Sequence, residues 1–144
     1  MIKSLNPDEC KHQIAALVAD NWSETGFDWE LKPNWQMYGK LYEMGYLISL
    51  AAFDQDEIVG YSVATVSPHL FNSDVKVCTT NALFVKPSHR KRLVSGKLIV
   101  ETEREAKRRG AIRILWQTRA NTPLAEVLRK RGYQDADVAM MKGI

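Results

Sequence analysis

The chain has 144 residues, 45% apolar and 26% charged, and this size and composition fit one globular domain with one hydrophobic core. A formal net charge of +3 is too small to indicate nucleic-acid or membrane binding by itself. No apolar run approaches a membrane span, and the first residues, MIKSLNPDEC, lack the apolar segment of a signal peptide. Two cysteines, Cys10 and Cys78, are too few for a disulfide scaffold, so we expect a cytoplasmic protein.

The first third of the chain predicts a short strand and two helices. Residues 2–5 fit a first strand, and Asn-Pro-Asp then opens a helix expected over 6–21. Residues 22–34 predict a loop or a broken helix that carries two tryptophans. A second helix is expected over 35–45, with an inner face of Met37, Leu41 and Met44.

The middle of the chain predicts three strands. Two apolar runs, 47–53 and 58–66, flank the turn sequence D-Q-D-E and indicate a β-hairpin. Residues 67–74 are expected to form a loop. The run 75–85 predicts a long third strand, which ends before Pro87.

The last third predicts a helix, a strand, a helix and a final strand. Residues with a spacing of four indicate a helix over 94–109, ended by glycine, and the apolar run 111–118 indicates a strand. Pro123 suits the first turn of a helix that ends before Gly132, and 133–142 could form a last strand. A helix therefore links two strands in the βαβ manner, and we expect a mixed α/β fold over 1–144 as one domain.

The stretch R-K-R-L-V-S-G-K at 90–97 lies between a strand and a helix. Free N–H groups and the positive end of the dipole make a helix start suitable for phosphate, and the basic side chains add charge. A solvated surface run is the ordinary alternative. A nucleic-acid patch over 90–109 is another, although three glutamates interrupt it and no aromatic residues interleave.

The wider context of this stretch resembles a known family. The order L-F-V-x-P-x-x-R-x-x-x-x-x-G-x-L at 83–98, then R-x-G, an apolar strand, Asn121 and R-G-Y at 131–133, resembles the GNAT-type N-acetyltransferases, in a variant similar to those of bacteriophages. The resemblance covers about 45–133 well and the N-terminal helices loosely. It implies a mixed, mostly antiparallel sheet flanked by helices, with a splayed strand pair where acetyl-coenzyme A (acetyl-CoA) binds.

The resemblance also implies which residues bind acetyl-CoA. They are Leu83, Phe84, Val85, Arg90, Lys91, Arg92, Leu93, Val94, Ser95, Gly96, Lys97 and Asn121. In the family the loop is usually R/Q-x-x-G-x-G/A, so that Leu93 and Ser95 stand where glycines are usual. Leu93 can serve there if its backbone is helical and its side chain turns inward. Asn121 could equally be an N-cap ahead of Pro123.

Acetyl transfer to an amine needs a base, a polarised thioester carbonyl and a protonated leaving group. By the resemblance, Asn81 stands at the usual carboxylate position and Leu128 at the usual tyrosine position, and neither can transfer a proton. His69, in the loop before the splayed strand, is the candidate base, with a structural role as the alternative. Spacing of His and Cys residues predicts no metal site.

Aromatic residues gather between the first two helices, beside carboxylates. Trp22, Asp28 and Trp29 are the candidate acceptor-binding residues, because aromatic rings and carboxylates suit a cationic amine. The alternative is that these tryptophans cap the core under a long loop.

We therefore expect an acetyl-CoA-dependent N-acetyltransferase that acts on a primary amine of a small molecule or a protein. One alternative is a catalytically degenerate GNAT-like module that binds coenzyme A or a host protein. The other is a nucleic-acid binder that uses the 90–109 face. Membrane binding is not expected, and homodimerisation is left open.

Overall fold

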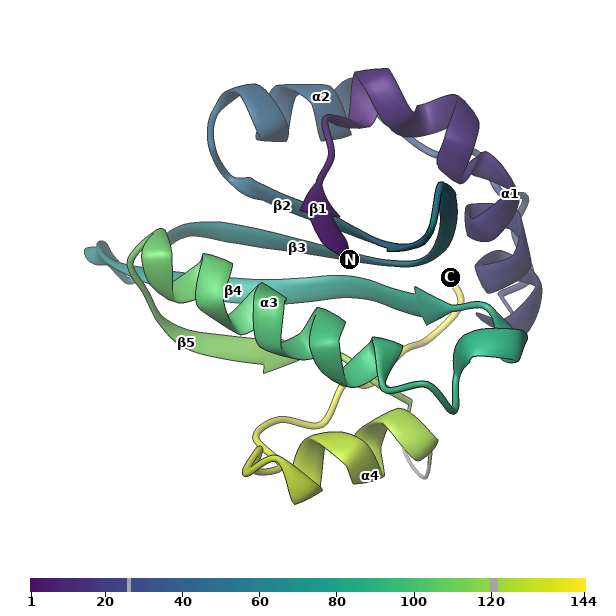
Figure 1. Ribbon diagram of the computed structural model, residues 1–144. Helices are drawn as coiled ribbons and strands as arrows, with labels where there is room; N and C mark the ends of the chain where they lie inside the picture. The colour runs from purple at the N-terminus through teal and green to yellow at the C-terminus, as the bar shows by residue number, and fades with distance from the viewer. Residues whose placement is uncertain (26, 120–121) are drawn as a thin grey trace.

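A five-stranded sheet forms the centre of this computed structural model, which describes residues 1–25, 27–119 and 122–144 (Figure 1). The strands are β1 (Ile2–Ser4), β2 (Leu47–Asp54), β3 (Glu57–His69), β4 (Asn72–Val85) and β5 (Ala111–Trp116), which lie in that spatial order. Neighbours are antiparallel except β4 and β5, which are parallel. The mixed, mostly antiparallel sheet expected from the sequence is confirmed.

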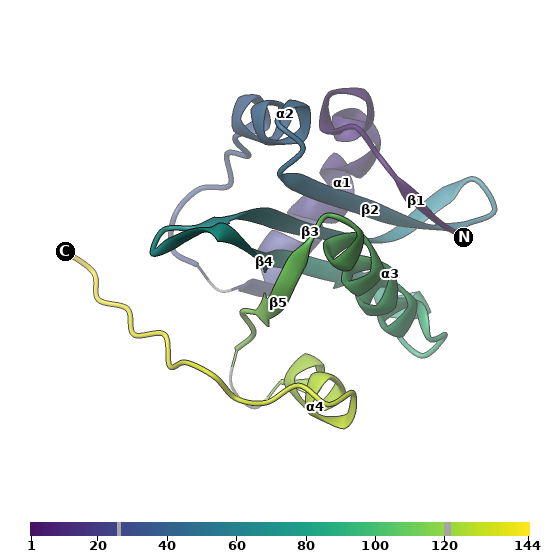
Figure 2. The same ribbon diagram turned by 90° about the vertical axis from the view of Figure 1, so that its left-hand side faces the viewer.

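Helices cover both faces of the sheet. They are α1 (Pro7–Thr25), α2 (Trp35–Glu43), α3 (Val94–Arg108) and α4 (Pro123–Lys130). Figures 1 and 2 show α1 and α2 on one face, α3 on the other, and α4 at the β5 end of the sheet. Within the residues described, no helix is both long and apolar enough to cross a membrane.

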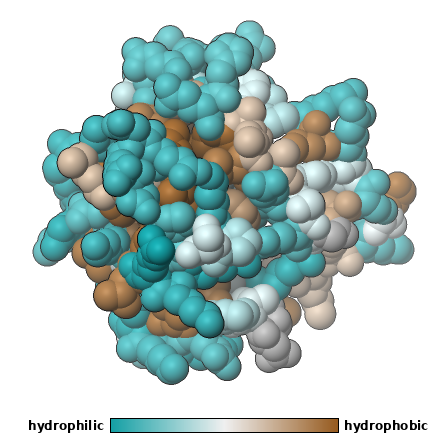
Figure 3. All heavy atoms as spheres, turned by 45° about the vertical axis from the view of Figure 1, so that its right-hand side comes forward, coloured by the Kyte–Doolittle hydropathy of each residue, from teal (hydrophilic) through white to brown (hydrophobic). Residues whose placement is uncertain are grey.

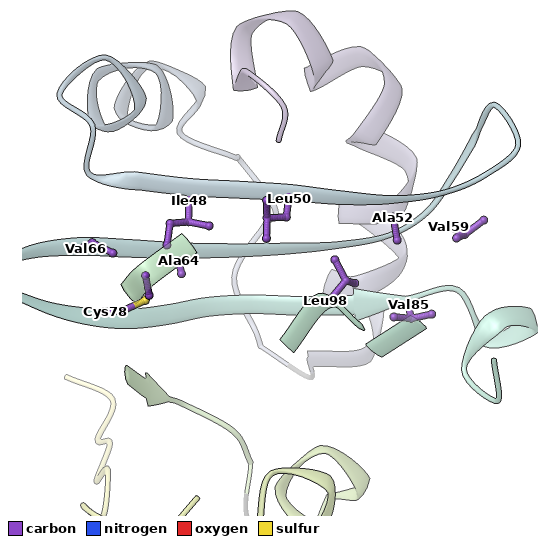
Figure 4. Packing of buried hydrophobic residues seen from close by; sticks show 10 residues of the cluster. Ile48, Leu50, Ala52, Val59, Ala64, Val66, Cys78, Val85 and Leu98 are labelled. Carbon is purple, nitrogen blue, oxygen red and sulfur yellow. The ribbon is translucent and has the colours of Figure 1, made fainter. Parts of the chain in front are cut away.

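The face of the sheet under α3 holds the larger core cluster. Figure 4 shows side chains of β2, β3 and β4, such as Ile48 and Val85, gathered with Leu98 of α3. One buried polar pair lies in this layer, where the hydroxyls of Ser62 and Thr102 are 2.9 Å apart. Each hydroxyl therefore has a partner, and the pair fixes α3 over β3 at little cost.

The opposite face packs against α1. Cys10, Ile14 and Leu17, spaced by three and four residues, are buried against Tyr61 and Phe84 of the sheet. This spacing is the one that places side chains on one face of a helix. Because successive strand residues point to opposite faces, β2 contributes to both clusters.

The inner face predicted for the second helix is wrong. Met37 and Met44 are 50% and 60% exposed, and Leu41 is half-buried. The face turned inward begins at Trp35 and continues with Tyr38 and Gly39, which are half-buried and buried. The cap at Asn34, whose side chain accepts from the Met37 N–H, sets where the helix starts and therefore which face it buries.

The loop predicted over 67–74 is a continuous hairpin. β3 runs to His69 and β4 starts at Asn72, so only Leu70 and Phe71 lie at the tip. Pro68 suggested a break, but it pairs with Lys76 beside an irregularity in the register. Proline is tolerated in a strand at such an irregularity.

The final strand predicted over 133–142 is also wrong. These residues form neither strand nor helix and run away from α4 as an extended chain (Figure 2). The ion pair between Arg129 and Asp135, with Nε and Oδ1 3.0 Å apart, holds the start of this segment beside α4. An apolar run becomes a strand only where it meets the edge of a sheet, and this one does not.

Candidate functional site

An unpaired backbone edge lies at the C-terminal half of β4. Pairing of β4 with β5 ends at Thr80 and Trp116, whereas β4 continues to Val85 with only β3 beside it. No described strand pairs with 81–85 on the β5 side. Free N–H and C=O groups along a strand can receive an extended polar chain as an added strand.

A β-bulge marks the point where this edge begins. Val63 pairs with Ala82 and the next β3 residue, Ala64, pairs with Thr80, so Asn81 is the extra residue. A bulge bends its strand and re-aims neighbouring side chains, and bulges are frequent beside active sites. Asn81 is exposed at this bend.

The loop after β4 ends at a residue with left-handed backbone. Leu93 has φ 61° and ψ 9°, precedes the first turn of α3, and makes no side-chain cap. Its side chain is 75% exposed. The expectation of a helical backbone and an inward side chain is therefore corrected: Leu93 adopts the conformation that glycine takes most easily, and its side chain points to solvent.

The basic residues of the loop divide into two groups. Arg90 is held in place, because its guanidinium donates to both Glu24 carboxylate oxygens at 2.7 and 2.9 Å and to the Val85 carbonyl at 2.9 Å. Arg92 lies 3.5 Å from Asp54. Lys91 and Lys97 are exposed and form no ion pair with the described part of the chain. These two lysines are therefore free to meet an anion.

The structure places the other predicted cofactor residues around the same loop. Phe84 and Val85 are buried at the end of β4, and Val94, Ser95 and Gly96 form the first turn of α3. Leu83 packs against the α3 side of the core. The call for Asn121 falls outside the described residues.

His69 is not brought to this site. It pairs with Asn72 at the tip of the β3–β4 hairpin, nine residues along β4 from Asn81, or ~30 Å at the usual rise. Its Nδ1 accepts from the Phe71 N–H at 3.1 Å. The interpretation of His69 as the base is therefore corrected: His69 organises a turn. Leu128 is buried in α4 and cannot move a proton.

A cavity of about 400 Å³ lies between α1, α2, their connecting loop and the sheet. Trp22 and Trp29 line it, as predicted, and Asn81 and Ala82 line it where β4 leaves β5. Asp28 is exposed and does not line it. Figure 3 shows hydrophobic surface between hydrophilic side chains on the side of the molecule where α1 lies.

The sequence analysis missed several residues inside this cavity. Tyr61 accepts a hydrogen bond of 2.7 Å from the Asn21 amide, and burial raises the pKa of its phenol to about 12. Burial also raises the pKa of the Cys10 thiol, so it stays protonated and is no nucleophile. The alternation Y-S-V-A in β3, which puts Tyr61 and Val63 on one face, was the available signal.

The fold resembles solved acetyltransferases along its whole length. An aminoglycoside acetyltransferase, HMB0005, from an uncultured soil metagenomic sample is 22% identical with TM-score 0.77, covering 100% of this chain and 97% of that one. A ribosomal-protein-alanine N-acetyltransferase from Brucella melitensis biovar Abortus 2308 is 16% identical with TM-score 0.74, covering 100% and 99%. An aminoglycoside N-acetyltransferase AAC(6')-Iy, solved with CoA, is 16% identical with TM-score 0.73, covering 100% and 98%. At these identities the likeness is one of fold.

Curated protein sequences gave no match. The sequence does match the model of the Acetyltransferase (GNAT) family over residues 14–133, which include α2, the whole of β2 to β5, α3 and α4. The splayed strand, the phosphate-suited helix start and this match over most of the chain lead to one conclusion: the protein belongs to the GNAT acetyltransferase family.

Proposed function

We propose that the protein is an acetyl-CoA-dependent N-acetyltransferase that acetylates a primary amine. The observation that carries the proposal is the open β4 edge over 81–85, which connects the start of α3 to the cavity under α1. One end of this edge offers phosphate-suited amides, and the other opens on a pocket for an acceptor. Members of the family use acetyl-CoA.

The residues at the edge divide the binding of acetyl-CoA between them. The free N–H groups of the first turn of α3 suit the diphosphate, with Lys91 and Lys97 adding charge. The unpaired backbone from Leu83 to Val85 suits the amides of the pantetheine arm. Arg90 acts indirectly, because its contacts with Glu24 and the Val85 carbonyl tie the end of α1 to the loop.

Acetyl transfer then needs little side-chain chemistry from this chain. The amine nitrogen forms a bond to the thioester carbonyl carbon, the C–S bond breaks, and the amine proton goes to the departing sulfur, directly or through water. A backbone N–H beside the bulge at Asn81 is suited to polarise the carbonyl. Position, rather than proton transfer by His69 or Leu128, supplies the rate enhancement.

Two alternatives are separated from this proposal by specific features. The replacement of the usual acidic and phenolic groups by Asn81 and Leu128 favours a module that binds coenzyme A without turnover. The nucleic-acid alternative is weakened on α3, where Glu105 pairs with both Arg108 and Arg109. Glu101 likewise pairs with Arg104. Paired arginines have less charge to offer a phosphate backbone.

The test uses a charge change at the start of α3. The protein is incubated with acetyl-CoA and a panel of primary amines, and free thiol and acetylated product are measured. A side chain at Gly96 meets no atom within 4 Å, so Gly96→Glu and Gly96→Gln should both fold. The glutamate should abolish activity by repelling the diphosphate, whereas the isosteric glutamine should keep most of it.

Equal activity of the two variants would contradict the proposed binding site. Tight binding of acetyl-CoA without thiol release for any amine would favour the binding module. Loss of nucleic-acid affinity with salt, in the absence of acetyl-CoA binding, would favour the second alternative.

A further inference from the structure

The cavity beside Asn81 is built mainly from aromatic and aliphatic side chains. Trp22, Phe27 and Trp29 form one aromatic group, with ring centroids 4.4 to 6.0 Å apart, and Trp35 and Tyr38 form a second one 5.9 Å apart. All five line the cavity. Such walls favour a planar or apolar body of up to drug-like size over a sugar, because sugars bring hydroxyls that would lose their water.

The cavity offers almost no negative charge. Glu30 is the single carboxylate in its described lining; it is exposed and lies 3.3 Å from Lys32, which also lines the cavity. The nearby Glu24 is bound by Arg90, and Asp28 faces solvent. A polycationic acceptor would therefore lose the hydration of several ammonium groups without gaining carboxylate partners.

Uncharged polar groups occupy the deeper part of the cavity. Asn21 donates to Tyr61, which leaves the phenol hydrogen of Tyr61 free to donate to a ligand. Ser49 and Asn81 also line the cavity and are neutral. One small amino group can be hydrogen-bonded here, but a full positive charge would have no partner among the lining residues described at this depth.

None of the titratable groups in the lining is suited to deprotonate an ammonium ion. Besides Glu30 and Lys32 they are Cys10, Tyr38 and Tyr61. Burial raises the pKa values of Cys10 and Tyr61, so both hold their protons at neutral pH. Tyr38 is a phenol, and Glu30 is already paired. An amine that arrives uncharged needs no such base.

We propose that the acceptor is an aromatic amine of the aniline class, which is uncharged at neutral pH, and that this cavity excludes polycationic acceptors. This rests on the proposed function for the chemical step and on the cavity alone for binding. In the step, the aniline nitrogen bonds to the acetyl carbon, the C–S bond breaks, and the nitrogen's proton ends on the sulfur of coenzyme A.

The decisive comparison uses two isomers that differ in charge and not in size. 4-Ethylaniline is neutral at pH 7, whereas 2-phenylethylamine is almost wholly protonated, as lysine is. We expect kcat/KM for 4-ethylaniline at pH 7 to be at least about tenfold higher, because protonation leaves only ~10⁻³ of an alkylamine reactive. Its rate should stay level between about pH 6.5 and 8.5, while that of 2-phenylethylamine should rise about tenfold per pH unit. Sisomicin, a polycation, should not react.

Binding is measured separately, without acetyl-CoA, by quenching of tryptophan fluorescence. Trp29→Leu should weaken 4-ethylaniline binding about threefold to tenfold by loss of an aromatic contact. Phe71→Leu, at the hairpin tip and 95% exposed, should leave it unchanged. Binding without turnover of any amine would overturn the proposed enzyme but support this pocket. Turnover of sisomicin or 2-phenylethylamine in preference to 4-ethylaniline, or no quenching at all, would overturn this inference.

Discussion

At the scale of single residues, the site depends on a few unusual positions rather than on a set of catalytic side chains. Leu93 has a left-handed backbone without being glycine, Asn81 is the extra residue of a bulge, and Tyr61 is a buried phenol whose hydrogen is free. Each is uncommon in its local structure, and backbone strain tends to persist at functional sites. Two of these positions allow direct tests.

Replacing Leu93 by glycine should stabilise the protein. A left-handed backbone costs a residue with a Cβ about 1–2 kcal/mol, and the greater freedom of glycine in the unfolded chain returns about 0.5–1 kcal/mol of this. We expect a net gain of a few tenths to about 1 kcal/mol in the free energy of unfolding, measured by urea denaturation. Leu93→Ala keeps the Cβ and should show no gain; a gain from alanine as large as that from glycine would show that the backbone is not the cause.

Tyr61→Phe should alter stability at high pH. The folded pKa of Tyr61, about 12, lies above the model value of 10.0, so its contribution is fully present below pH 10 and is lost as the pH rises through 12. This raised pKa corresponds to about 2–3 kcal/mol lost by the wild type over that range. The phenylalanine variant should lose less stability between pH 9.5 and 11.5, and equal slopes in both proteins would refute the burial of this phenol.

At the scale of elements, β4 carries the site because it is paired differently along its length. Residues 76–80 lie between β3 and β5, and residues 81–85 have β3 alone. The close fit of β3 to the second half is visible at Gly60, where an added Cβ would lie 2.8 Å from the Phe84 carbonyl oxygen. The splay thus needs a tight β3–β4 pair on one side and an open edge on the other.

Gly60→Ala should therefore damage both the sheet and the site. The contact with a backbone oxygen cannot be relieved by a rotamer change, so we expect a loss of about 1–3 kcal/mol in the free energy of unfolding. Thermal denaturation with and without acetyl-CoA measures both effects. Gly143→Ala, which meets no atom within 4 Å, is the control and should match the wild type. An undisturbed Gly60→Ala variant would mean that β3 and β4 are not so close.

The sequence predicts elements much better than it predicts their relations. The hairpin over 47–66, the helix that ends at Gly110 and the helix that begins at Pro123 follow from local periodicity and caps, and they are confirmed. The bulge at Asn81 and the end of pairing at Trp116 depend on which strands meet, which local pattern does not encode. For the same reason the apolar pattern over 133–142 predicted a strand where no partner strand lies.

The candidate site was predictable to the extent that it is local. The loop over 90–97 was identified because it is contiguous, whereas the cavity brings together residues more than 70 positions apart, from Cys10 to Ala82. His69 was chosen by residue type alone, and the pairing of strands puts it at the far end of β4. Glu24 was interpreted as part of an acceptor site, but its partner is Arg90.

At the scale of the whole molecule, the two faces of the sheet have separate tasks. The α3 face holds the larger core and the helix start suited to phosphate, and the α1 face holds the cavity. The open edge of β4 is where the two meet. Arg90 joins them as well, since it contacts Glu24 of α1, the Val85 carbonyl and the Phe84 ring. Binding at the edge should therefore stiffen both sides of this junction.

Amide hydrogen exchange with and without acetyl-CoA tests this account most directly. If the open edge and the start of α3 bind acetyl-CoA, exchange should slow by at least about tenfold in peptides covering 81–97, because their free N–H groups gain partners. Peptides covering the hairpin tip, 67–74, should exchange as before and serve as the internal control. Protection of 81–97 alone, or together with α1, is the predicted result. Unchanged exchange over 81–97 at saturating acetyl-CoA, or protection confined to the basic surface of 101–109, would contradict it.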